Sequence, residues 1–331
     1  MQRPAIKLSL AIALAGFALA APLKAETLKL ATIIPDDSAW TNNLKKFAQE
    51  VKEKTASRVE IKLYSGGVQG DEPDILRKIR VGQLQGGILT GSAMGSVYSD
   101  VRVLELPFNF VDDRALALKV IKDLGPTFAE GFAAKGFKVL GLYEQGKVYI
   151  ISKKSVASFE EIRKTKFWSW TGDEIVSAML KGLQFTPINL GLTDVLPSLS
   201  TGLVDTVFGP PLGILALQWN TKVEYLLNYP VTYGFGALML SSKAFDKISK
   251  EDQKIVEDLG QRYIQLTNDE VVKGNDEALQ TMKKMGIKFM DLPKSDLEQA
   301  KKVRLAVIAE LTGKVFSKKT LDLFEKSANG K

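Results

Sequence analysis

Apolar and polar positions along the chain change repeatedly between the alternation or short apolar runs of strands and the three- and four-residue spacing of helices. Strand-like and helix-like segments take turns in the first third of the chain, at 27–34, 36–55, 59–65, 71–83 and 86–90. Asp37 or Ser38 would cap the first helix. Strands separated by helices normally build a parallel sheet, so this pattern predicts an α/β fold.

The same alternation returns in the middle of the chain. Two strand candidates, 137–144 and 147–154, are separated by Gln145-Gly146, and Ser158 to Glu161 has the Ser-x-x-Glu pattern of a capping box that opens a short helix. Further strand and helix candidates continue to Gly209. The chain repeats its architecture without repeating its sequence, as two α/β lobes would.

The last third of the sequence is predominantly helical. A polar, amphipathic stretch from Ser249 to about Met285, interrupted only by Gly260 and Gly274, predicts one long helix or two nearly continuous ones. A second capping box at 295–298 precedes a final helical region. No low-complexity linker divides the lobes, so we expect strands of the sheet to cross between them as a hinge.

The N-terminus has the pattern of a secretory signal peptide. Arg3 and Lys7 precede an apolar run at 8–23 that contains no acidic residue. We predict a signal peptide over 1–25, a mature start near Glu26 and a periplasmic location, without membrane insertion after cleavage.

Composition narrows the function further. Without residues 1–25, the chain of 331 residues keeps 42 basic against 38 acidic residues and shows no basic cluster, which argues against nucleic acid as a partner. There is no cysteine and no histidine. Thiol chemistry, a lipid-modified cysteine and the commonest general base are therefore excluded, and we predict neither a cofactor nor a metal site.

The order of several motifs resembles a known family of receptors. The matching segments are TASRVEIKLYSGGVQGDEPDILRKIRVGQLQGGILT (55–90), LELPFNF (104–110), SKKSVASFEEIRKTKFW (152–168) and LSTGLVDTVFGPP (199–211). In this order and spacing, they resemble the solute-binding receptors of tripartite ATP-independent periplasmic (TRAP) transporters.

The resemblance implies a two-lobed class II periplasmic-binding-protein fold with a hinge and a long helix in the C-terminal half. Lobe I would comprise 26–146 with about 240–275, and lobe II 147–239 with about 276–331 packing across the lobes. A small-molecule ligand would bind between them and pass to the membrane subunits of a TRAP permease. An ion gradient would supply the energy, since the chain has no phosphate-binding loop.

Three positions depart from the pattern that the resemblance implies. Trp168 stands where the family usually has an arginine that grips a ligand carboxylate, and an indole supplies one neutral donor but no positive charge. Lys147 stands at a second position that is often arginine, and Gly209 at one that is commonly asparagine. An ordinary dicarboxylate should therefore bind poorly, because a desolvated carboxylate without partners costs several kcal/mol.

We expect instead an apolar, aromatic or amphipathic ligand that contacts aromatic side chains. Two residues apart on a strand, Trp168 and Trp170 would share one face. The candidate contacts are Trp168, Trp170, Trp40, Phe108 and Phe110.

Each candidate also has a structural interpretation. Aromatic residues at strand spacing are commonly core, and Lys147 could be a solvated residue at a strand end. Glu72 could line the cleft or favour a helix N-terminus electrostatically, and Asp173 fits a helix cap better than a ligand contact.

Two other functions remain open. An enzyme would need an activated nucleophile or a metal, and the sequence offers only a formal Ser-Lys pair or the weak cluster of Asp71, Glu72 and Asp74. A periplasmic lipid carrier or interaction protein would use the same apolar cleft for a lipid or for a partner's helix.

Overall fold

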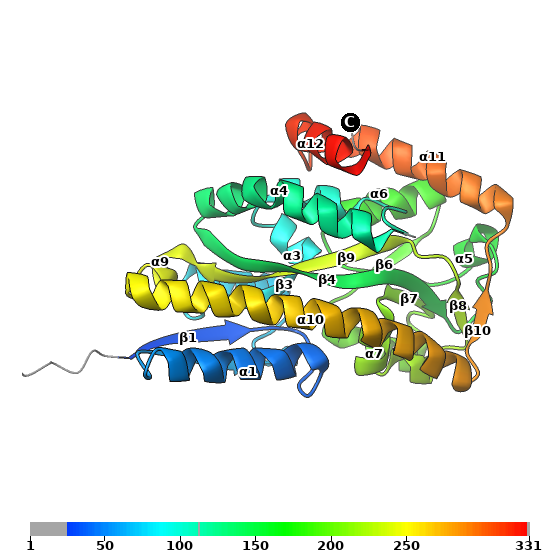
Figure 1. Ribbon diagram of the computed structural model, residues 1–331. Helices are drawn as coiled ribbons and strands as arrows, with labels where there is room; N and C mark the ends of the chain where they lie inside the picture. Colours follow the sequence, from blue (N-terminus) through cyan, green and yellow to red (C-terminus); the bar gives the residue numbers. More distant parts are fainter. Residues whose placement is uncertain (1–24, 112, 330–331) are drawn as a thin grey trace, which may run out of the picture.

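Strands and helices alternate and form one mixed sheet of ten strands in the computed structural model, which describes residues 25–111 and 113–329. The main strand order is β2-β1-β3-β9-β4-β7-β5-β6. Two strands lie off this path: β8 pairs with β4 and also with β10. Apart from Ala25, the predicted signal peptide lies outside the described residues. Helices α4 and α12 lie on one side of β4, and α10 lies on the other (Figure 1).

The first group of strands is parallel where β1 meets β2 and β3. Its elements, with those that lead to β4, are β1 (Glu26–Ala31), α1 (Ala39–Lys54), β2 (Val59–Tyr64), α2 (Glu72–Arg80), β3 (Gly86–Thr90), α3 (Gly91–Gly95), η1 (Ser99–Glu105) and α4 (Arg114–Ala134). Ser38 caps α1, and its hydroxyl accepts a hydrogen bond from Thr41 N at 3.2 Å. The predicted alternation of strands and helices is confirmed in this region.

The second group uses shorter strands. Its elements are α5 (Phe159–Arg163), β5 (Phe167–Ser169), α6 (Glu174–Leu183), β6 (Pro187–Asn189), η2 (Leu192–Asp194), α7 (Val195–Thr201), β7 (Thr206–Gly209), α8 (Pro211–Ala216), η3 (Trp219–Lys222) and β8 (Tyr225–Leu227). Ser158 caps α5 and accepts from Glu161 N at 3.2 Å. The Glu161 carboxylate reaches back to Ala157 N at 2.9 Å, so this capping box closes one residue earlier than the standard pattern.

Two long strands connect the groups. β4 (Phe137–Ser152) pairs antiparallel with β9 (Thr232–Ser241) at one end and with β7 at the other. The prediction of two separate strands around Gln145-Gly146 is therefore wrong. The register shifts between Glu144 and Gly146, and Gly146 has φ +89°, so the glycine forms a bulge within one strand instead of a turn between two.

The predicted long helix is present as α10 (Lys250–Lys284), which follows the cap Ser249 and runs against α1, β4 and α8. Gly260 and Gly274 lie inside it without ending it. A Cβ on Gly260 would stand 3.1 Å from Leu140 of β4, and one on Gly274 would stand 3.0 Å from Leu212 of α8. The two glycines therefore allow the helix to approach its neighbours closely.

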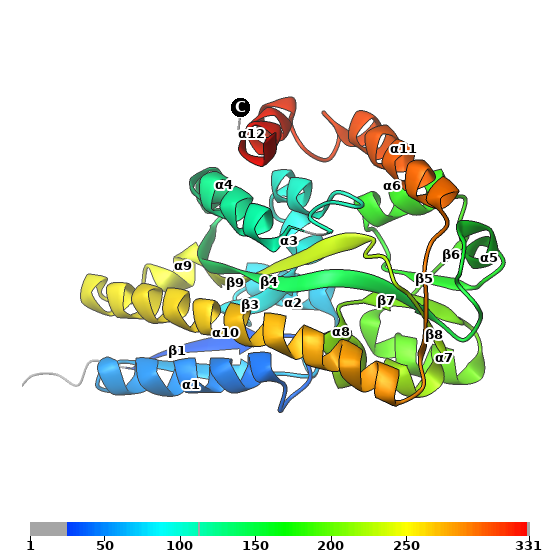
Figure 2. The same cartoon turned by 45° about the vertical axis from the view of Figure 1, so that its right-hand side comes forward.

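The chain then ends in helices on the opposite side from α10. The remaining elements are α9 (Ser242–Phe245), β10 (Lys288–Met290), α11 (Lys294–Leu311) and α12 (Lys318–Asn329). Figure 2 shows α11 over α6 and α12 over α4, and both pairs are in contact. The predicted cap at Ser295 is wrong, because Pro293 takes the N-cap position and Ser295 lies inside the first turn of α11.

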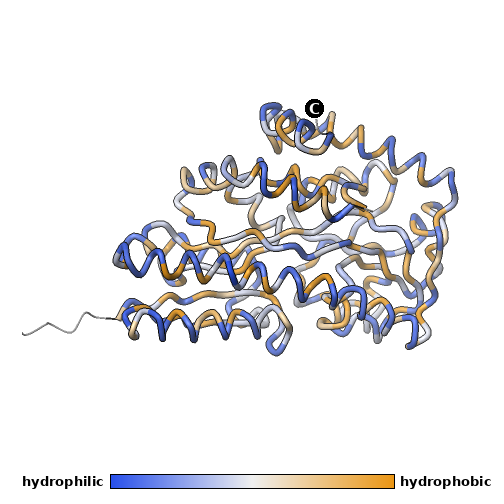
Figure 3. The backbone as a smooth tube through the Cα atoms, in the orientation of Figure 1, coloured by the Kyte–Doolittle hydropathy of each residue, from blue (hydrophilic) through white to orange (hydrophobic). Residues whose placement is uncertain are grey.

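Buried apolar side chains form two clusters. One fills the space between α1, the first strands and α10, and includes Phe47 and Ile264; the other, larger cluster extends through the rest of the molecule. The outer helices change between hydrophilic and hydrophobic residues along their length, as amphipathic helices do (Figure 3). Within the described ranges, no helix combines the length and the hydropathy of a membrane span.

Candidate functional site

A cavity opens between the two groups of strands and encloses about 140 Å³. An apolar cavity of about 150 Å³ admits a molecule the size of benzene, so this one suits a compact solute. Its walls come from the β1–α1 loop, the start of α3, η1, the middle of β4, the segment after β5, and β7 with α8 and η3. Segments far apart in sequence thus meet at the crossing strands β4 and β9.

One wall is aromatic. Trp170, Phe208 and Trp219 line the cavity, whereas Trp168 is fully buried behind them. The Trp168 ring centroid lies 4.7 Å from that of Trp170, 5.2 Å from Phe208 and 5.4 Å from Trp219. Its indole Nε1 donates to Leu190 O at 3.2 Å. The two tryptophans therefore share a face as predicted, and Trp168 fixes the rings that face the cavity.

The structure brings three of the sequence-predicted site residues to this cavity: Trp40, Trp170 and Gly209 line it. A Cβ on Gly209 would stand 3.4 Å from the Trp219 ring and 3.5 Å from Ile214, which is ordinary contact. Gly209 therefore contributes backbone to the wall, next to an aromatic ring.

The other predicted residues are not among those that line the cavity. Phe108 lies between Phe159 and Tyr229, with ring centroids 6.5 Å and 6.1 Å away, and Phe110 is also buried. Lys147 is half-buried on β4, and strand alternation points it away from the face of its neighbour Val148, which lines the cavity. The role of each in ligand binding stays a prediction.

Glu72 sits behind the cavity, where it bonds to the lining residue Thr90. Thr90 N donates to Oε1 at 2.7 Å, and the Thr90 hydroxyl lies 2.5 Å from Oε2. Burial raises the pKa of Glu72 to about 7, although the bonds from Thr90 oppose the shift. Its neighbour Asp71 caps α2 and accepts from Leu192 N at 3.1 Å, which links α2 to η2 at the edge of the cavity.

The cavity lining also carries an ionic group that the sequence analysis missed. We call Arg102, Glu105 and Asp173 the cavity cluster; all three line the cavity. Arg102 Nη2 donates to Asp173 Oδ1 at 2.8 Å, and Arg102 Nη1 lies 3.5 Å from Glu105 Oε2. Asp173 also caps α6, as predicted, by accepting from Val176 N at 3.0 Å. The sequence does contain one signal for this group, namely the two charged residues within the apolar stretch VRVLELPF (101–108).

Within the cavity cluster, burial and the neighbouring charges shift the pKa values in opposite directions. Burial alone would lower the pKa of Arg102, but the charges of Asp173 and Glu105 outweigh it and hold this pKa above its ordinary value. Burial raises the pKa of Glu105, against the charge of Arg102. The single guanidinium on the described cavity wall is therefore already committed to two carboxylates.

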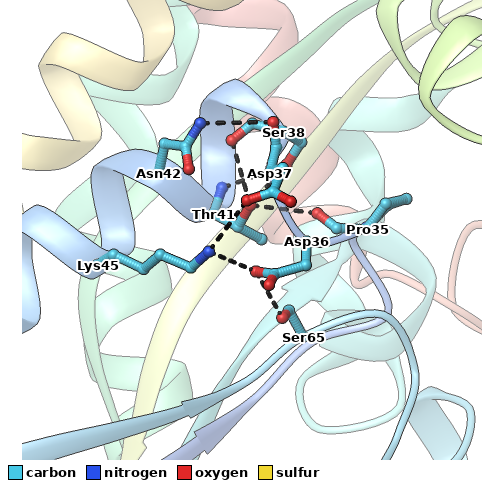
Figure 4. A network of polar contacts seen from close by, with 8 residues as sticks. All are labelled: Pro35, Asp36, Asp37, Ser38, Thr41, Asn42, Lys45 and Ser65. Atoms are coloured by element: carbon cyan, nitrogen blue, oxygen red, sulfur yellow. Dashed lines mark hydrogen bonds and ion pairs between the residues drawn. The ribbon is translucent and has the colours of Figure 1, made fainter.

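A polar network holds the β1–α1 loop in place (Figure 4). Lys45 Nζ lies 2.8 Å from Asp36 Oδ1, and the Ser65 hydroxyl donates to the same oxygen at 3.0 Å. The Thr41 hydroxyl donates to Pro35 O at 3.1 Å. These bonds tie the loop to α1 and to the end of β2, and so position the cavity residues Pro35 and Trp40.

Trp40 itself has an unused donor. Its side chain is only 6% exposed, and its indole Nε1 has no hydrogen-bond partner among the described residues. A buried donor without a partner is costly, and because Nε1 is shielded from solvent, a ligand acceptor would reach it only after the indole turned toward the cavity.

Known proteins with this arrangement are solute-binding proteins. Residues 30–314 match the model of the bacterial extracellular solute-binding proteins, family 7. The ectoine/5-hydroxyectoine-binding periplasmic protein UehA of Ruegeria pomeroyi is 27% identical over 259 residues, which cover 75% of this chain and 74% of that protein.

Solved structures show the same fold. A TRAP periplasmic solute-binding protein from Desulfovibrio salexigens with bound orotic acid matches with a TM-score of 0.83 and 18% identity, over 92% of this chain and 99% of the other. The sugar-acid-binding protein DctPAm of Advenella mimigardefordensis, in complex with galactonate, matches with a TM-score of 0.85 and 20% identity, over 93% and 99%. The two-lobed class II fold is therefore confirmed.

Proposed function

The chain belongs to family 7 of the bacterial extracellular solute-binding proteins, the TRAP receptors, and we propose that it captures a compact amphipathic solute rather than a simple dicarboxylate. Members of this family are receptors, not enzymes. The observation that carries the proposal is the state of Arg102, the one cationic side chain on the described cavity wall, which is paired with both Asp173 and Glu105.

A ligand carboxylate would meet an unfavourable environment at this wall. To bind Arg102 through two parallel hydrogen bonds, it would have to displace Asp173, which would then be left buried without its partner. If it did not displace Asp173, it would lie near two carboxylates in a largely apolar cavity. Both alternatives cost several kcal/mol, and two carboxylates on one ligand would meet this penalty twice.

The aromatic wall supplies the favourable contacts. Trp170, Phe208 and Trp219 offer ring faces and edges for a flat or apolar part of the solute. The relatives named above bind polar molecules, namely ectoine or 5-hydroxyectoine, orotic acid and galactonate. We therefore place polar groups on the solute beside its apolar face, and the small cavity favours such a compact molecule over the acyl chain of a lipid.

Delivery to a membrane permease of the TRAP type completes the proposed role, with capture in the periplasm. We assign lobe I to 26–146 with about 240–275, and lobe II to 147–239 with about 276–331. This division is supported by the change from one strand group to the other along β4, near the bulge at Gly146. The Asp71–Leu192 hydrogen bond then joins the lobes beside the cavity, where it would favour the closed state.

Native mass spectrometry of the protein, purified from its periplasm without denaturation, tests the proposal. We expect one co-purified metabolite with a compact, partly apolar structure. A bound C4-dicarboxylate would contradict the proposed ligand class, and a bound phospholipid or fatty acid would support a lipid carrier in its place.

A further inference from the structure

The cavity lining contains one guanidinium and two carboxylates, together with several aromatic rings. We propose that the solute carries a cationic nitrogen group, such as an ammonium or an amidinium, which binds at the cavity cluster and contacts the aromatic rings. This inference rests on the receptor function proposed above and specifies the charge of its ligand.

The bonds within the cavity cluster show how the charges are arranged. Asp173 Oδ1 receives both Arg102 Nη2, at 2.8 Å, and Val176 N, at 3.0 Å. Glu105 is held more loosely: Phe235 N donates to its Oε1 at 3.1 Å, and Arg102 lies 3.5 Å from its Oε2, beyond a normal hydrogen bond. Glu105 is therefore the carboxylate that can turn toward a ligand cation.

The Glu105 carboxylate packs directly against the backbone of Gly91. A Cβ on Gly91 would stand 1.9 Å from Glu105 Oε2, so only glycine leaves room for the carboxylate there. Gly91 lines the cavity at the start of α3, next to Thr90. The carboxyl group is thus brought to the cavity by close packing and is not left there as a solvated surface charge.

The aromatic rings of the cavity lining suit a cation. Indole and phenyl faces attract ammonium and guanidinium groups through their quadrupoles, and tryptophan is the strongest of these rings. The lining includes three tryptophans, Trp40, Trp170 and Trp219, together with Tyr143 and Phe208. A compact cation in a cavity of about 140 Å³ would lie close to both the rings and Glu105.

Trp40 also lines the cavity, and its indole Nε1 is a buried donor without a partner among the described residues. A solute acceptor such as a hydroxyl, carbonyl or single carboxylate oxygen would satisfy this donor once the ring turns toward the solute. Cation and acceptor together describe an amino alcohol, an amide-bearing amine or a zwitterion, which are all polar molecules with a small apolar body.

Calorimetric titration of the full mature protein, after dialysis has removed any co-purified solute, tests the charge directly. Benzylammonium, benzyl alcohol and benzoate share a ring of suitable size and differ mainly in charge. We expect benzylammonium to bind at least about tenfold more tightly than benzoate, with benzyl alcohol between them.

The outcomes separate the two proposals. Benzoate binding as tightly as benzylammonium, or more tightly, would overturn the cationic ligand and leave the receptor proposal intact. If none of the three compounds bound, the assignment of this cavity to a compact ring-sized solute would fail, and the charge inference would fail with it.

A charge-inverting variant tests whether the cavity cluster is responsible. Glu105→Gln with Asp173→Asn keeps the shapes and the cap of α6 but leaves Arg102 without an anionic partner in the cluster. We expect its preference to invert, with benzoate gaining and benzylammonium losing about tenfold each, while benzyl alcohol changes little. Exposed Glu277→Gln on α10 is the matched control and should change none of the three affinities.

Unchanged charge preference in the folded double variant would overturn the assignment of the cation to this cluster. Binding of benzyl alcohol reports whether the cavity has kept its shape. Should the double variant fail to fold, Glu105→Gln alone carries the test, because it removes one charge and leaves the Arg102–Asp173 pair in place. Its expected effect is a selective loss of benzylammonium binding, and an equal loss for all three compounds would contradict the proposal.

Discussion

Two of the arginine–carboxylate groups among the described residues have fully or nearly fully buried carboxylates near the crossing strands, and they differ in what surrounds them. The cavity cluster faces an open cavity. The second group, which we call the hinge cluster, consists of Arg114 at the start of α4, Glu144 at the bulge of β4 and Tyr233 of β9. Glu144 is fully buried, and both of its carboxylate oxygens accept hydrogen bonds from Arg114, while the Tyr233 hydroxyl donates to Oε2 at 2.5 Å.

The comparison shows that burial of a charge does not by itself identify a binding site. In the hinge cluster, the partners of the carboxylate are protein groups, and Asn268 of α10 also accepts from Glu144 N at 3.0 Å. In the cavity cluster, Glu105 keeps a loose ion pair and borders empty volume. We therefore expect changes in the hinge cluster to alter stability, and changes in the cavity cluster to alter ligand selection.

The largest expected effect is on the hinge cluster. Arg114→Ala leaves Glu144 buried without its cation, so the free energy of unfolding should fall by about 3 to 4 kcal/mol, while the order of affinities among ligands of different charge is kept. Urea denaturation measures the loss. Arg77→Ala removes an exposed pair with Asp74 and should cost less than about 1 kcal/mol. Equal losses for the two variants would contradict the distinction between the clusters.

Glu72, a buried carboxylate outside both clusters, gives the next effect, which depends on pH. Its folded pKa, about 7, lies above the ordinary value of 4.5, so the unfolded state releases the proton first. The stability contributed by protonated Glu72 is full below pH 4.5 and is lost as pH rises toward 7, by about 3 kcal/mol.

Glu72→Gln should remove this loss, because the amide does not titrate. Its oxygen can accept from Thr90 N, and its NH2 group can donate to the Thr90 hydroxyl oxygen, which replaces the bond that this hydroxyl donates to Glu72 Oε2. Urea denaturation between pH 4.5 and pH 7 compares the variant with the wild type and with the exposed control Glu277→Gln. Parallel pH profiles for Glu72→Gln and the wild type would show that Glu72 is ionised in the folded state.

On the aromatic side of the cavity, Trp170→Leu should weaken binding of the co-purified solute by about 2 kcal/mol, or roughly thirtyfold. The ring lines the cavity and is only partly buried in the apolar core, so the melting temperature without ligand should change little. Calorimetry measures the affinity. A large loss of stability with unchanged affinity would mean that Trp170 acts as core and not as a ligand contact.

The last prediction adds a single methyl group next to the cavity cluster. Gly91→Ala places a Cβ where the Glu105 carboxylate now lies, so the carboxylate must move aside, at a cost of about 1 to 3 kcal/mol. The variant should nevertheless lose binding of a cationic ligand. Gly125→Ala in α4, where a Cβ meets nothing within 4 Å, is the control and should leave binding unchanged. Equal affinities in both variants would contradict the role of Glu105.

The local elements of the fold could be predicted because their signals are local. Ser38, Ser158 and Ser249 cap helices through bonds to backbone N–H groups three residues ahead, a spacing that the sequence shows directly. Ser295 fits the same pattern but does not cap, because Pro293 takes the N-cap position two residues earlier and the helix begins at Lys294. The glycine at 146 could be read as a turn or as a bulge, and pairing with β9, about 90 residues away, selects the bulge.

The candidate site was harder to predict, because it depends on how deeply each side chain is buried and on which residues far apart in the sequence come into contact. Strand alternation shows that Trp168 and Trp170 share a face but not which ring reaches the cavity; Phe208 and Trp219, from later segments, cover Trp168. The absence of an arginine at position 168 was visible in the sequence. The pairing of Arg102 with Asp173, 71 residues away, was not, since a charge in an apolar stretch indicates burial without naming its partner.

The most direct test of the account is a crystal structure of the protein with the solute that co-purifies with it. We predict that the solute lies against Trp170 with a nitrogen near Glu105, while Arg102 remains bonded to Asp173. A solute carboxylate bound to Arg102 through two hydrogen bonds, with Asp173 turned away, would contradict the claim that this cavity selects against simple acids.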